Sequence, residues 1–250
     1  MSVAVATLIS ADPYIRERLD PAPGDSMYLH LSDLRHAMSS VADERALDVL
    51  DFGCGGSPYR GLFPNAQYYR ADLSGSEGID YEIKLGDVQE PLPVAGGSFD
   101  LVLSSQVLEH VTEPGEYLRE ARRVLRAGGR LLLTTHGVFE DHGCPYDFQR
   151  WTDAGLSRLV NRHGFEIERM SKLTTGPRAV MFLLEQDFPR VSVKSRHGIM
   201  LFPLRWVLGG RRRAGWHRWC DTVFANHRVV VKDLSKHRLY IGLGCVARAI

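Results

Sequence analysis

The stretch Asp51-Phe52-Gly53-Cys54-Gly55-Gly56 is the strongest indicator of the fold, and it directly follows the apolar run Ala-Leu-Asp-Val-Leu at 46–50. An apolar run that ends in glycines predicts a buried strand leading into a tight turn. Because glycine has no Cβ atom, the backbone of such a turn can approach a ligand closely. Dinucleotide-binding turns carry a third glycine, where this chain has Pro58. The carboxylate of Asp51 at the turn favours a cationic ligand over a pyrophosphate.

The composition is that of an ordinary globular protein. The chain has 250 residues, 44% hydrophobic and 24% charged, with a formal net charge of +1. This length suits one large α/β domain with additions, and the charge gives no general attraction to nucleic acid or membranes. No C-x-x-C pair indicates zinc or a redox couple. Because we find no signal peptide and no apolar run of about 20 residues, we expect a cytoplasmic protein without a membrane span.

The apolar patterns predict strands that alternate with helices. Strands are expected at 46–52, 67–71, within 81–89 (a short strand and its following loop), 99–105, 130–135, 165–170 and 239–247, and helices at 28–38, 116–126 and 152–163. This succession predicts an α/β fold with a doubly wound, mostly parallel, seven-stranded Rossmann-like sheet. We expect a helical N-terminal cap or lid over 1–45, a main domain over 46–250, and a helical insertion at about 173–237 before the last strand.

Acidic and hydroxyl side chains fall where the predicted strands end. Asp51, Asp72, Asp87 and Ser104 each follow or close a strand. Ligands of doubly wound sheets bind at the carboxyl ends of the strands, and an acid at the end of the second strand can hold a ribose diol. These positions therefore predict a nucleoside-containing ligand at one edge of the sheet.

Three motifs carry a resemblance to a known family. The D-x-G-x-G pattern at 51–55, the P-x-x-x-x-S-F-D-L-V run at 93–102 and the L-E-H element at 108–110 resemble those of class I S-adenosylmethionine-dependent methyltransferases of type 11. The resemblance extends over 46–172 and implies S-adenosylmethionine as the cofactor. It implies that the cofactor is held by Asp51, Gly53, Cys54, Gly55, Asp72, Leu73, Asp87, Val88, Ser104 and Gln106.

The segment 135–152 is the predicted acceptor side, since it follows the fifth strand. Methyl transfer depends on aligning the acceptor with the methyl group, and a hydroxyl acceptor gains from a general base. We expect His142 to be that base, oriented by Asp141 or Asp147, with His136 and His110 as alternatives. The residues predicted to contact the acceptor are Tyr146, Asp147, Arg150 and Tyr59.

The run P-Y-D-F-x-R-W-T at 145–152 resembles a pattern in methyltransferases of bacterial polysaccharide and glycosylated natural-product pathways. It implies O-methylation of a sugar hydroxyl, on a polysaccharide or mannoside or on a glycosylated small molecule. The first alternative is an N- or C-methyltransferase for a natural product or quinone-like acceptor, which would need no strong base. The others are an RNA methyltransferase, with salt-sensitive binding through 211–218, and a cofactor-binding module without catalysis.

Two further features stay open at this level. Glu140 and Asp141 are adjacent carboxylates that suit Mg²⁺, and a resemblance to macrolide-sugar O-methyltransferases implies Glu109 as a third ligand; a solvated acidic turn is the alternative. The Arg- and Trp-rich segment 205–219 can bind a glycan, an acidic substrate or single-stranded RNA, or anchor the insertion. The apolar stretch 200–207 suggests a homodimer face or a substrate lid.

Overall fold

The computed structural model describes residues 13–73, 78–83, 90–188 and 212–250. Its strands are β1 (Asp48–Phe52), β2 (Gln67–Leu73), β3 (Tyr81–Ile83), β4 (Phe99–Ser105), β5 (Leu125–His136), β6 (Phe165–Thr175), β7 (Val229–Val230) and β8 (Tyr240–Ala249). Its α-helices are α2 (Pro13–Leu19), α3 (Tyr28–Ser39), α4 (Pro114–Val124), α5 (Asp153–Arg162), α6 (Gly176–Asp187) and α8 (Arg213–Val223). Short 3-10 helices are η1 (Arg60–Leu62), η2 (Leu108–His110), η6 (Ala225–His227) and η7 (Leu234–Lys236). No helix of these segments has the length and apolar character needed to span a bilayer.

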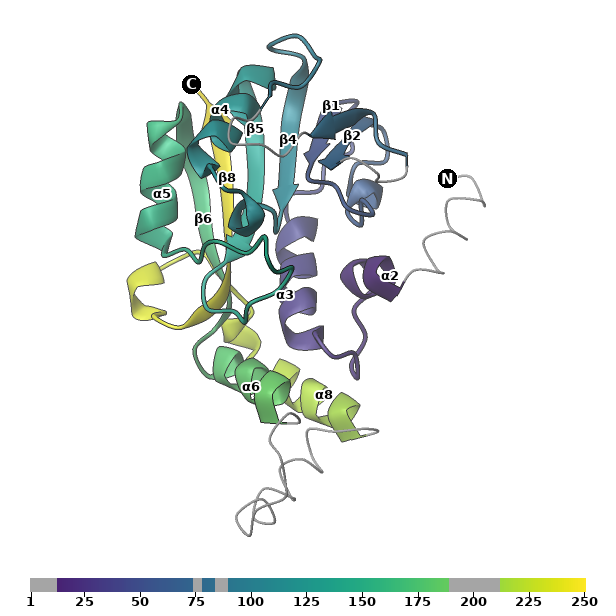
Figure 1. Ribbon diagram of the computed structural model, residues 1–250. Coiled ribbons are helices and arrows are strands. Elements are labelled where there is room, and N and C mark those ends of the chain that lie inside the picture. Colours follow the sequence, from purple (N-terminus) through teal and green to yellow (C-terminus); the bar gives the residue numbers. More distant parts are fainter. Residues whose placement is uncertain (1–12, 74–77, 84–89, 189–211) are drawn as a thin grey trace. The chain divides into compact units, whose positions relative to one another are not determined.

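The strands form a mixed sheet in the order β3-β2-β1-β4-β5-β8-β6-β7 (Figure 1). β1 pairs in parallel with both β2 and β4, β4 pairs in parallel with β5, and β8 runs antiparallel to β5. After β1 the chain forms β2 and β3 on one side of it and then crosses to form β4 on the other side. The β1–β4 junction is therefore a topological switch point. The predicted Rossmann-like fold is confirmed, with eight strands in the described segments rather than seven. The additional β7 has two residues, too few to produce a sequence pattern.

The described chain divides into two compact units. Unit 2 comprises 38–172 with 242–250 and contains β1 to β5 and most of β6 and β8, whereas unit 1 combines 1–37 with 173–241. Most of the predicted cap and the predicted insertion thus belong to the same unit. The proposed lid and acceptor-binding roles of these segments remain predictions.

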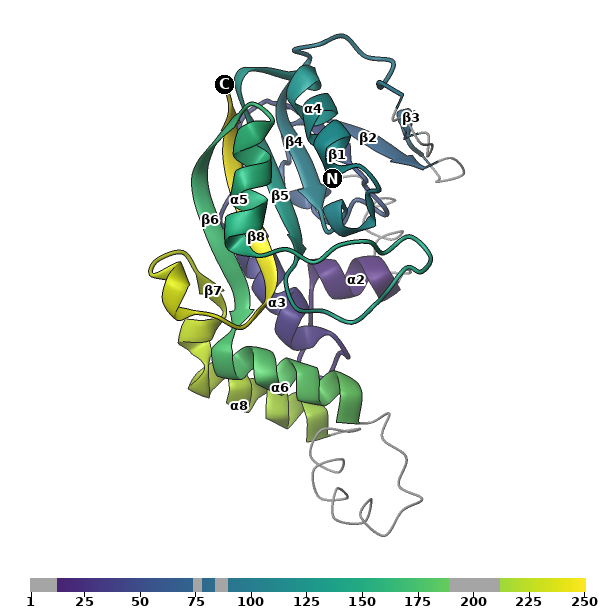
Figure 2. The same cartoon turned by 60° about the vertical axis from the view of Figure 1, so that its left-hand side comes forward.

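The core of unit 2 lies between the central strands and the helices that follow them. Val49, Leu50 and Phe52 of β1 are fully buried, as expected for a parallel strand covered on both faces. α4 and α5 cover one face of β4, β5 and β6 (Figure 2), and they bury apolar residues spaced at helical intervals: Tyr117, Leu118, Ala121, Val124, Leu156 and Val160. The predicted helix at 116–126 ends earlier, at Val124, because Leu125 pairs with Phe99 as the first residue of β5.

Unit 1 is built around a buried charge cluster. Asp33 of α3 and Arg178 of α6 are both fully buried, and the Arg178 Nε atom donates to Asp33 Oδ2 at 2.7 Å. Arg228 Nε donates to the other carboxylate oxygen of Asp33 at 2.9 Å, and Thr174 Oγ1 donates to Asp33 Oδ2 at 2.9 Å. Buried ions persist only when they are paired and hydrogen-bonded, and this cluster therefore links three separate stretches of the chain.

The described part of the Arg- and Trp-rich segment forms α8 in unit 1. The rings of Trp216 and Trp219 stack 5.1 Å apart, and Trp219 is 46% exposed. His217 is fully buried, and its Nε2 atom lies 2.8 Å from the carboxylate of Glu185. This helix is anchored through His217 and leaves an aromatic ring at the surface. Arg205, Trp206 and the 200–207 stretch lie outside the described residues.

Candidate active site

The glycine turn after β1 has the conformation that the sequence predicts. Gly53 has a φ angle of +80°, which favours glycine, and a Cβ atom there would lie 2.6 Å from both Cγ atoms of Val107. The amides of Gly53 and Cys54 both donate to the carbonyl of Ala71 in β2, at 2.8 and 3.1 Å. The turn is therefore held against β2 on one side and packed against Val107 on the other.

Asp72 at the end of β2 is bound directly to this turn. Its Oδ2 atom accepts the amide of Gly55 at 2.5 Å and lies 3.6 Å from the Cys54 thiol, while Oδ1 accepts the Leu73 amide at 2.7 Å. Leu73 is 39% exposed. Since β1 and β2 are parallel neighbours, their carboxyl ends bring six of the predicted cofactor residues to one edge: Asp51, Gly53, Cys54, Gly55, Asp72 and Leu73.

Asp51 is buried beside the turn rather than exposed at its mouth. Only 3% of the residue is accessible, and the hydroxyl of Tyr68 donates to its Oδ2 atom at 2.7 Å. Burial raises the pKa of Asp51 to about 7. A cationic ligand near this carboxyl group would favour its charged form.

Other predicted residues are less available to a ligand. Ser104 is fully buried, with the Tyr117 hydroxyl 2.8 Å from its Oγ atom, and Tyr59 is 1% exposed. Tyr59 therefore packs within the protein instead of facing an acceptor. Gln106 adopts a φ angle of +55° after β4 and donates its amide to the Thr134 carbonyl at 2.9 Å. Asp87 and Val88 lie outside the described residues.

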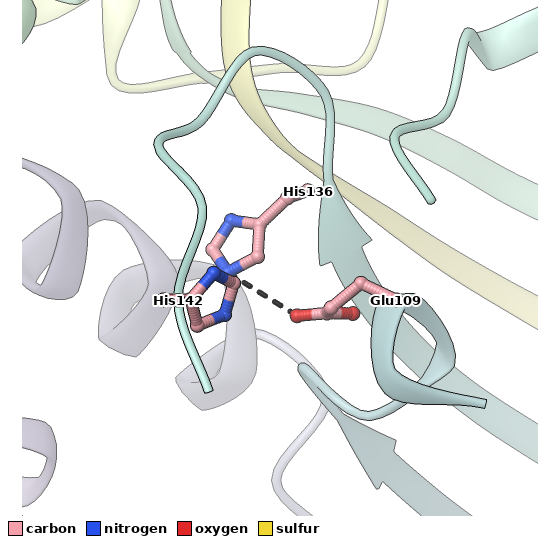
Figure 3. A group of neighbouring side chains, drawn as sticks. All are labelled: Glu109, His136 and His142. Atoms are coloured by element: carbon pink, nitrogen blue, oxygen red, sulfur yellow. Dashed lines mark ion pairs between the residues drawn. The ribbon is translucent and has the colours of Figure 1, made fainter. Parts of the chain in front are cut away.

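A second group of polar residues forms beyond the ends of β4 and β5. Glu109 belongs to η2, His136 is the last residue of β5, and His142 lies in the following loop (Figure 3). One atom from each side chain lies within 4.8 Å of the other two, and His136 Nε2 is 3.2 Å from Glu109 Oε1. The sequence predicted His142, with His136 as an alternative, as the base and Glu109 as a metal ligand, but it did not predict that the three residues meet. We refer to Glu109, His136 and His142 together as the strand-end triad.

Glu109 is the buried member of the triad. The residue is fully inaccessible, and its Oε2 atom accepts the Thr135 hydroxyl at 2.8 Å. Its Oε1 atom makes no hydrogen bond within the described residues and faces His136. Burial raises the pKa of Glu109. A buried carboxylate without full hydrogen bonding is unfavourable unless a positive charge compensates it.

His142 is held by its own loop. Its Nδ1 atom lies 3.2 Å from the carbonyl of Glu140 and 3.4 Å from Asp147 Oδ2. Because a carbonyl can only accept, this contact places the proton on Nδ1 and the lone pair on Nε2. Burial lowers the pKa of His142, which favours the neutral ring.

Asp147 and Arg150 stabilise this loop. Arg150 donates to both carboxylate oxygens of Asp147, at 2.6 and 2.7 Å, and this pair holds the pKa of Asp147 well below its usual range. The amide of His142 donates to Asp147 at 2.8 Å. Both residues, predicted to contact an acceptor, thus also position His142.

The remaining predicted residues of the loop lie outside the triad. The Asp141 side chain is 94% exposed and 4.0 Å from Arg150 Nη2, and Glu140 contributes its backbone carbonyl to Arg150 and His142. In the described part of the chain, neither joins Glu109 in a group of potential metal ligands. Tyr146 is 54% exposed, and its carbonyl lies 2.6 Å from Nδ1 of His110, whose ring contacts that of His142.

A cavity of about 660 Å³ in unit 2 lies at the opposite ends of the strands. Its lining includes Asp100 at the start of β4 and Arg126 at the start of β5, which form an ion pair at 2.6 Å. None of the predicted site residues lines it. The topology favours the carboxyl ends of the strands as the ligand edge, and we assign this cavity at their opposite ends no role.

Comparison with known proteins finds a family match within unit 2. Residues 50–133 match the family model of a methyltransferase domain. The matched segment contains the glycine turn, Asp72 and Glu109, whereas His136 and His142 follow it. The solved [4+2]-cyclase SpnF has the same fold, with a TM-score of 0.53 and 19% identity over 98% of this chain and 94% of that one.

Curated relatives include enzymes named as O-methyltransferases. A malonyl-[acyl-carrier protein] O-methyltransferase of Hahella chejuensis is 34% identical over 46% of this chain and 44% of that protein. A ubiquinone biosynthesis O-methyltransferase of Pseudomonas aeruginosa is 28% identical over 65% of this chain and 85% of that protein. The first relatives matched are covered over only 40 to 44% of their own length.

Proposed function

We propose that this chain is an S-adenosylmethionine-dependent methyltransferase that methylates a hydroxyl group. The observation that supports this most is the strand-end triad, in which a neutral histidine lies beyond the same sheet edge as the glycine turn. The match of residues 50–133 to a methyltransferase domain supports the class of reaction. The relatives named as O-methyltransferases support oxygen as the acceptor atom.

The edge formed by β1 and β2 fits the cofactor in charge and shape. Its carboxylates, Asp51 and Asp72, suit a ligand with a cationic amine and a ribose diol, and Gly55, whose amide donates to Asp72, carries no side chain. When bound, the cofactor supplies a methyl group on a sulfonium, whose bonding electron pair stays on sulfur as the methyl group leaves. Asp87, Val88, Ser104 and Gln106 remain predicted contacts.

The acceptor is proposed to bind beside the loop 137–151. Nε2 of His142 carries a lone pair and would take the hydroxyl proton, with Asp147 fixing the ring. His136 is the alternative base, and exposed Asp141 is the weaker candidate for orienting His142. A sugar hydroxyl, on a polysaccharide or mannoside or a glycosylated small molecule, is the proposed substrate, because exposed Tyr146 can stack on a sugar face.

The test combines cofactor binding with methyl transfer. Calorimetry should give one S-adenosylhomocysteine site per chain, and labelled methyl should pass to a member of a panel of mannosides, glucosides and glycosylated aglycones. His142→Asn should lower kcat by about 10²- to 10⁴-fold and leave cofactor affinity unchanged. His163→Asn is the matched control, because it makes the same substitution at a histidine outside the triad. His163 lies at the end of α5 and contacts the Leu159 carbonyl.

The opposite outcomes identify the alternatives. Full activity of His142→Asn would favour an N- or C-methyltransferase for a natural product or quinone-like acceptor. Cofactor binding without turnover on any acceptor would favour a cofactor-binding module, and salt-sensitive RNA binding through 211–218 would favour an RNA methyltransferase. The homodimer and the cytoplasmic location remain predictions.

A further inference from the structure

We propose that Glu109, His136 and His142 form a binding site for a divalent first-row transition metal, with Zn²⁺ as the reference ion. Two imidazoles and one carboxylate are a frequent ligand set for such ions, with a further position left open. The strand-end triad is the group that could hold an ion in the described part of the chain. Neither the methyltransferase-domain match nor the predicted Mg²⁺ site contains this set.

The spacing of the triad is close to that of a formed site. Zinc lies about 2.0–2.2 Å from nitrogen and oxygen ligands, so ligand atoms of a tetrahedral site lie about 3.4 Å apart. His136 Nε2 and Glu109 Oε1 already lie 3.2 Å apart, and all three ligand atoms lie within 4.8 Å of one another. His142 therefore has to approach by at most about 1.4 Å, which its loop position allows.

A neighbouring group orients each ligand of the triad, as is common for metal ligands. The Thr135 hydroxyl holds Oε2 of Glu109 and leaves Oε1 directed at the centre of the triad. The Glu140 carbonyl and Asp147 face Nδ1 of His142 and leave its Nε2 lone pair for the ion. The ring of His136 stacks on Phe139 at 3.9 Å, which restricts its rotation.

The ligand types select the class of ion. Mg²⁺ prefers six oxygen ligands, whereas two imidazole nitrogens favour Zn²⁺, Co²⁺ and related ions. A dication would also compensate the buried charge of Glu109. The His142 side chain is 31% exposed, so the site is open to solvent beside it.

The open position gives this ion a role that rests on the proposed function. A hydroxyl bound there would have a lowered pKa and would release its proton to solvent. His142 would then hold the ion through Nε2 instead of accepting the proton. The two roles of His142 therefore exclude each other, and metal occupancy decides between them.

The binding test uses the full chain without a polyhistidine tag and without cofactor or acceptor. Metal-free protein is titrated with Zn²⁺ by calorimetry and with Co²⁺ by visible absorption, which reports tetrahedral coordination. One site per chain is expected. Glu109→Gln, His136→Asn and His142→Asn should each weaken binding by about 100-fold or more, and Asp147→Asn by about 10- to 100-fold.

The controls separate a specific site from misfolding and from the carboxylate alternative. His163→Asn should bind Zn²⁺ as the unmodified chain does. Mg²⁺ at millimolar concentration should not displace Zn²⁺ from the triad. His142→Asn is the decisive variant, because His142 lies in a surface loop and its loss should leave the circular dichroism spectrum unchanged. Glu109→Gln is interpreted only if its thermal unfolding remains cooperative.

Three results would overturn the proposal. The first is the absence of a Zn²⁺ or Co²⁺ site, and the second is binding that His142→Asn leaves unaffected. The third is binding that depends on Glu140 and Asp141 and survives His136→Asn, which would assign the ion to the predicted Mg²⁺ site. Since cofactor binding is measured separately, loss of the metal site would leave the proposed methyl transfer in place with His142 as the base.

Discussion

Asp51 combines a buried position with a proposed role that calls for negative charge. Its carboxyl group is 3% accessible, and burial raises its pKa to about 7. Hydrogen bonds from Tyr68 and Ser57 and the charge of Arg70 compensate only part of the lost hydration, since burial still outweighs them. A cationic ligand would supply the rest. In the free protein, ionisation of Asp51 should therefore lower the free energy of unfolding as the pH rises.

The pH dependence of unfolding tests this destabilising effect of Asp51 ionisation. In the unfolded chain Asp51 ionises near its ordinary pKa of about 3.9, at a much lower pH than in the folded chain. Between about pH 4 and 7 the folded state holds the extra proton, so this group lowers the free energy of unfolding as pH rises. The effect is on the order of 4 kcal/mol. Asp51→Asn removes it.

The measurement is urea unfolding of the unmodified chain and of Asp51→Asn at several pH values from 4 to 8. The stability of the variant relative to the unmodified chain should increase steadily up to about pH 7. A difference independent of pH would show that the Asp51 carboxyl titrates normally. Asp51→Asn should also weaken S-adenosylhomocysteine binding most at pH 8, where the unmodified carboxyl group is charged.

Among the elements, the turn after β1, a proposed ligand-binding turn, also depends on a packing contact. Gly53 needs its positive φ, and the space where a Cβ atom would lie is filled by Val107 from the segment after β4. The glycine motif therefore also sets how closely this segment packs on β1. Since Glu109 follows Val107 by two residues, the turn packs against the segment that carries one member of the strand-end triad.

Gly53→Ala is expected to destabilise the chain by about 2–5 kcal/mol, from a strained φ angle and a clash with Val107. Gly128→Ala is the matched control, because Gly128 has a φ of +76° but open space around it; it should cost about 1 kcal/mol. Adding Val107→Ala to Gly53→Ala should recover part of the stability in denaturant unfolding. Equal costs at Gly53 and Gly128 would contradict the packing role.

For the molecule as a whole, unit 1 depends on residues far apart in sequence. Asp33 comes before the sheet begins, whereas Arg178 and Arg228 follow most of it, and all three meet in one buried cluster. Removing one partner from a buried ion pair leaves an uncompensated charge. The stability of unit 1 therefore depends strongly on the N-terminal segment.

Asp33→Asn should destabilise the chain by about 3–5 kcal/mol. Asp233→Asn is the control, because Asp233 pairs with Lys236 at the surface, where their side chains are 67% and 74% exposed; its effect should stay below about 1 kcal/mol. Urea unfolding followed by circular dichroism measures both. Similar small effects would show that the cluster contributes little net stability.

Local pattern was sufficient to predict the strand succession and the meeting of the glycine turn and Asp72 at one edge of the sheet. The apolar run at 46–50, the glycines after it and Asp72 each depend on neighbours in sequence, and parallel pairing then brings strand ends together. The end of α4 was predicted two residues late, because Leu125 fits helical spacing and only its partner Phe99 assigns it to β5.

The composition of the strand-end triad could not be read from the chain. Glu109 and His136 follow different strands, and they meet because β4 and β5 are parallel neighbours whose ends lie side by side. The burial of Tyr59 and the exposure of Asp141 likewise depend on packing against distant segments. Periodicity and turn chemistry are local and so appear in sequence, whereas burial, charge compensation and ligand geometry arise only when distant parts of the folded chain come together.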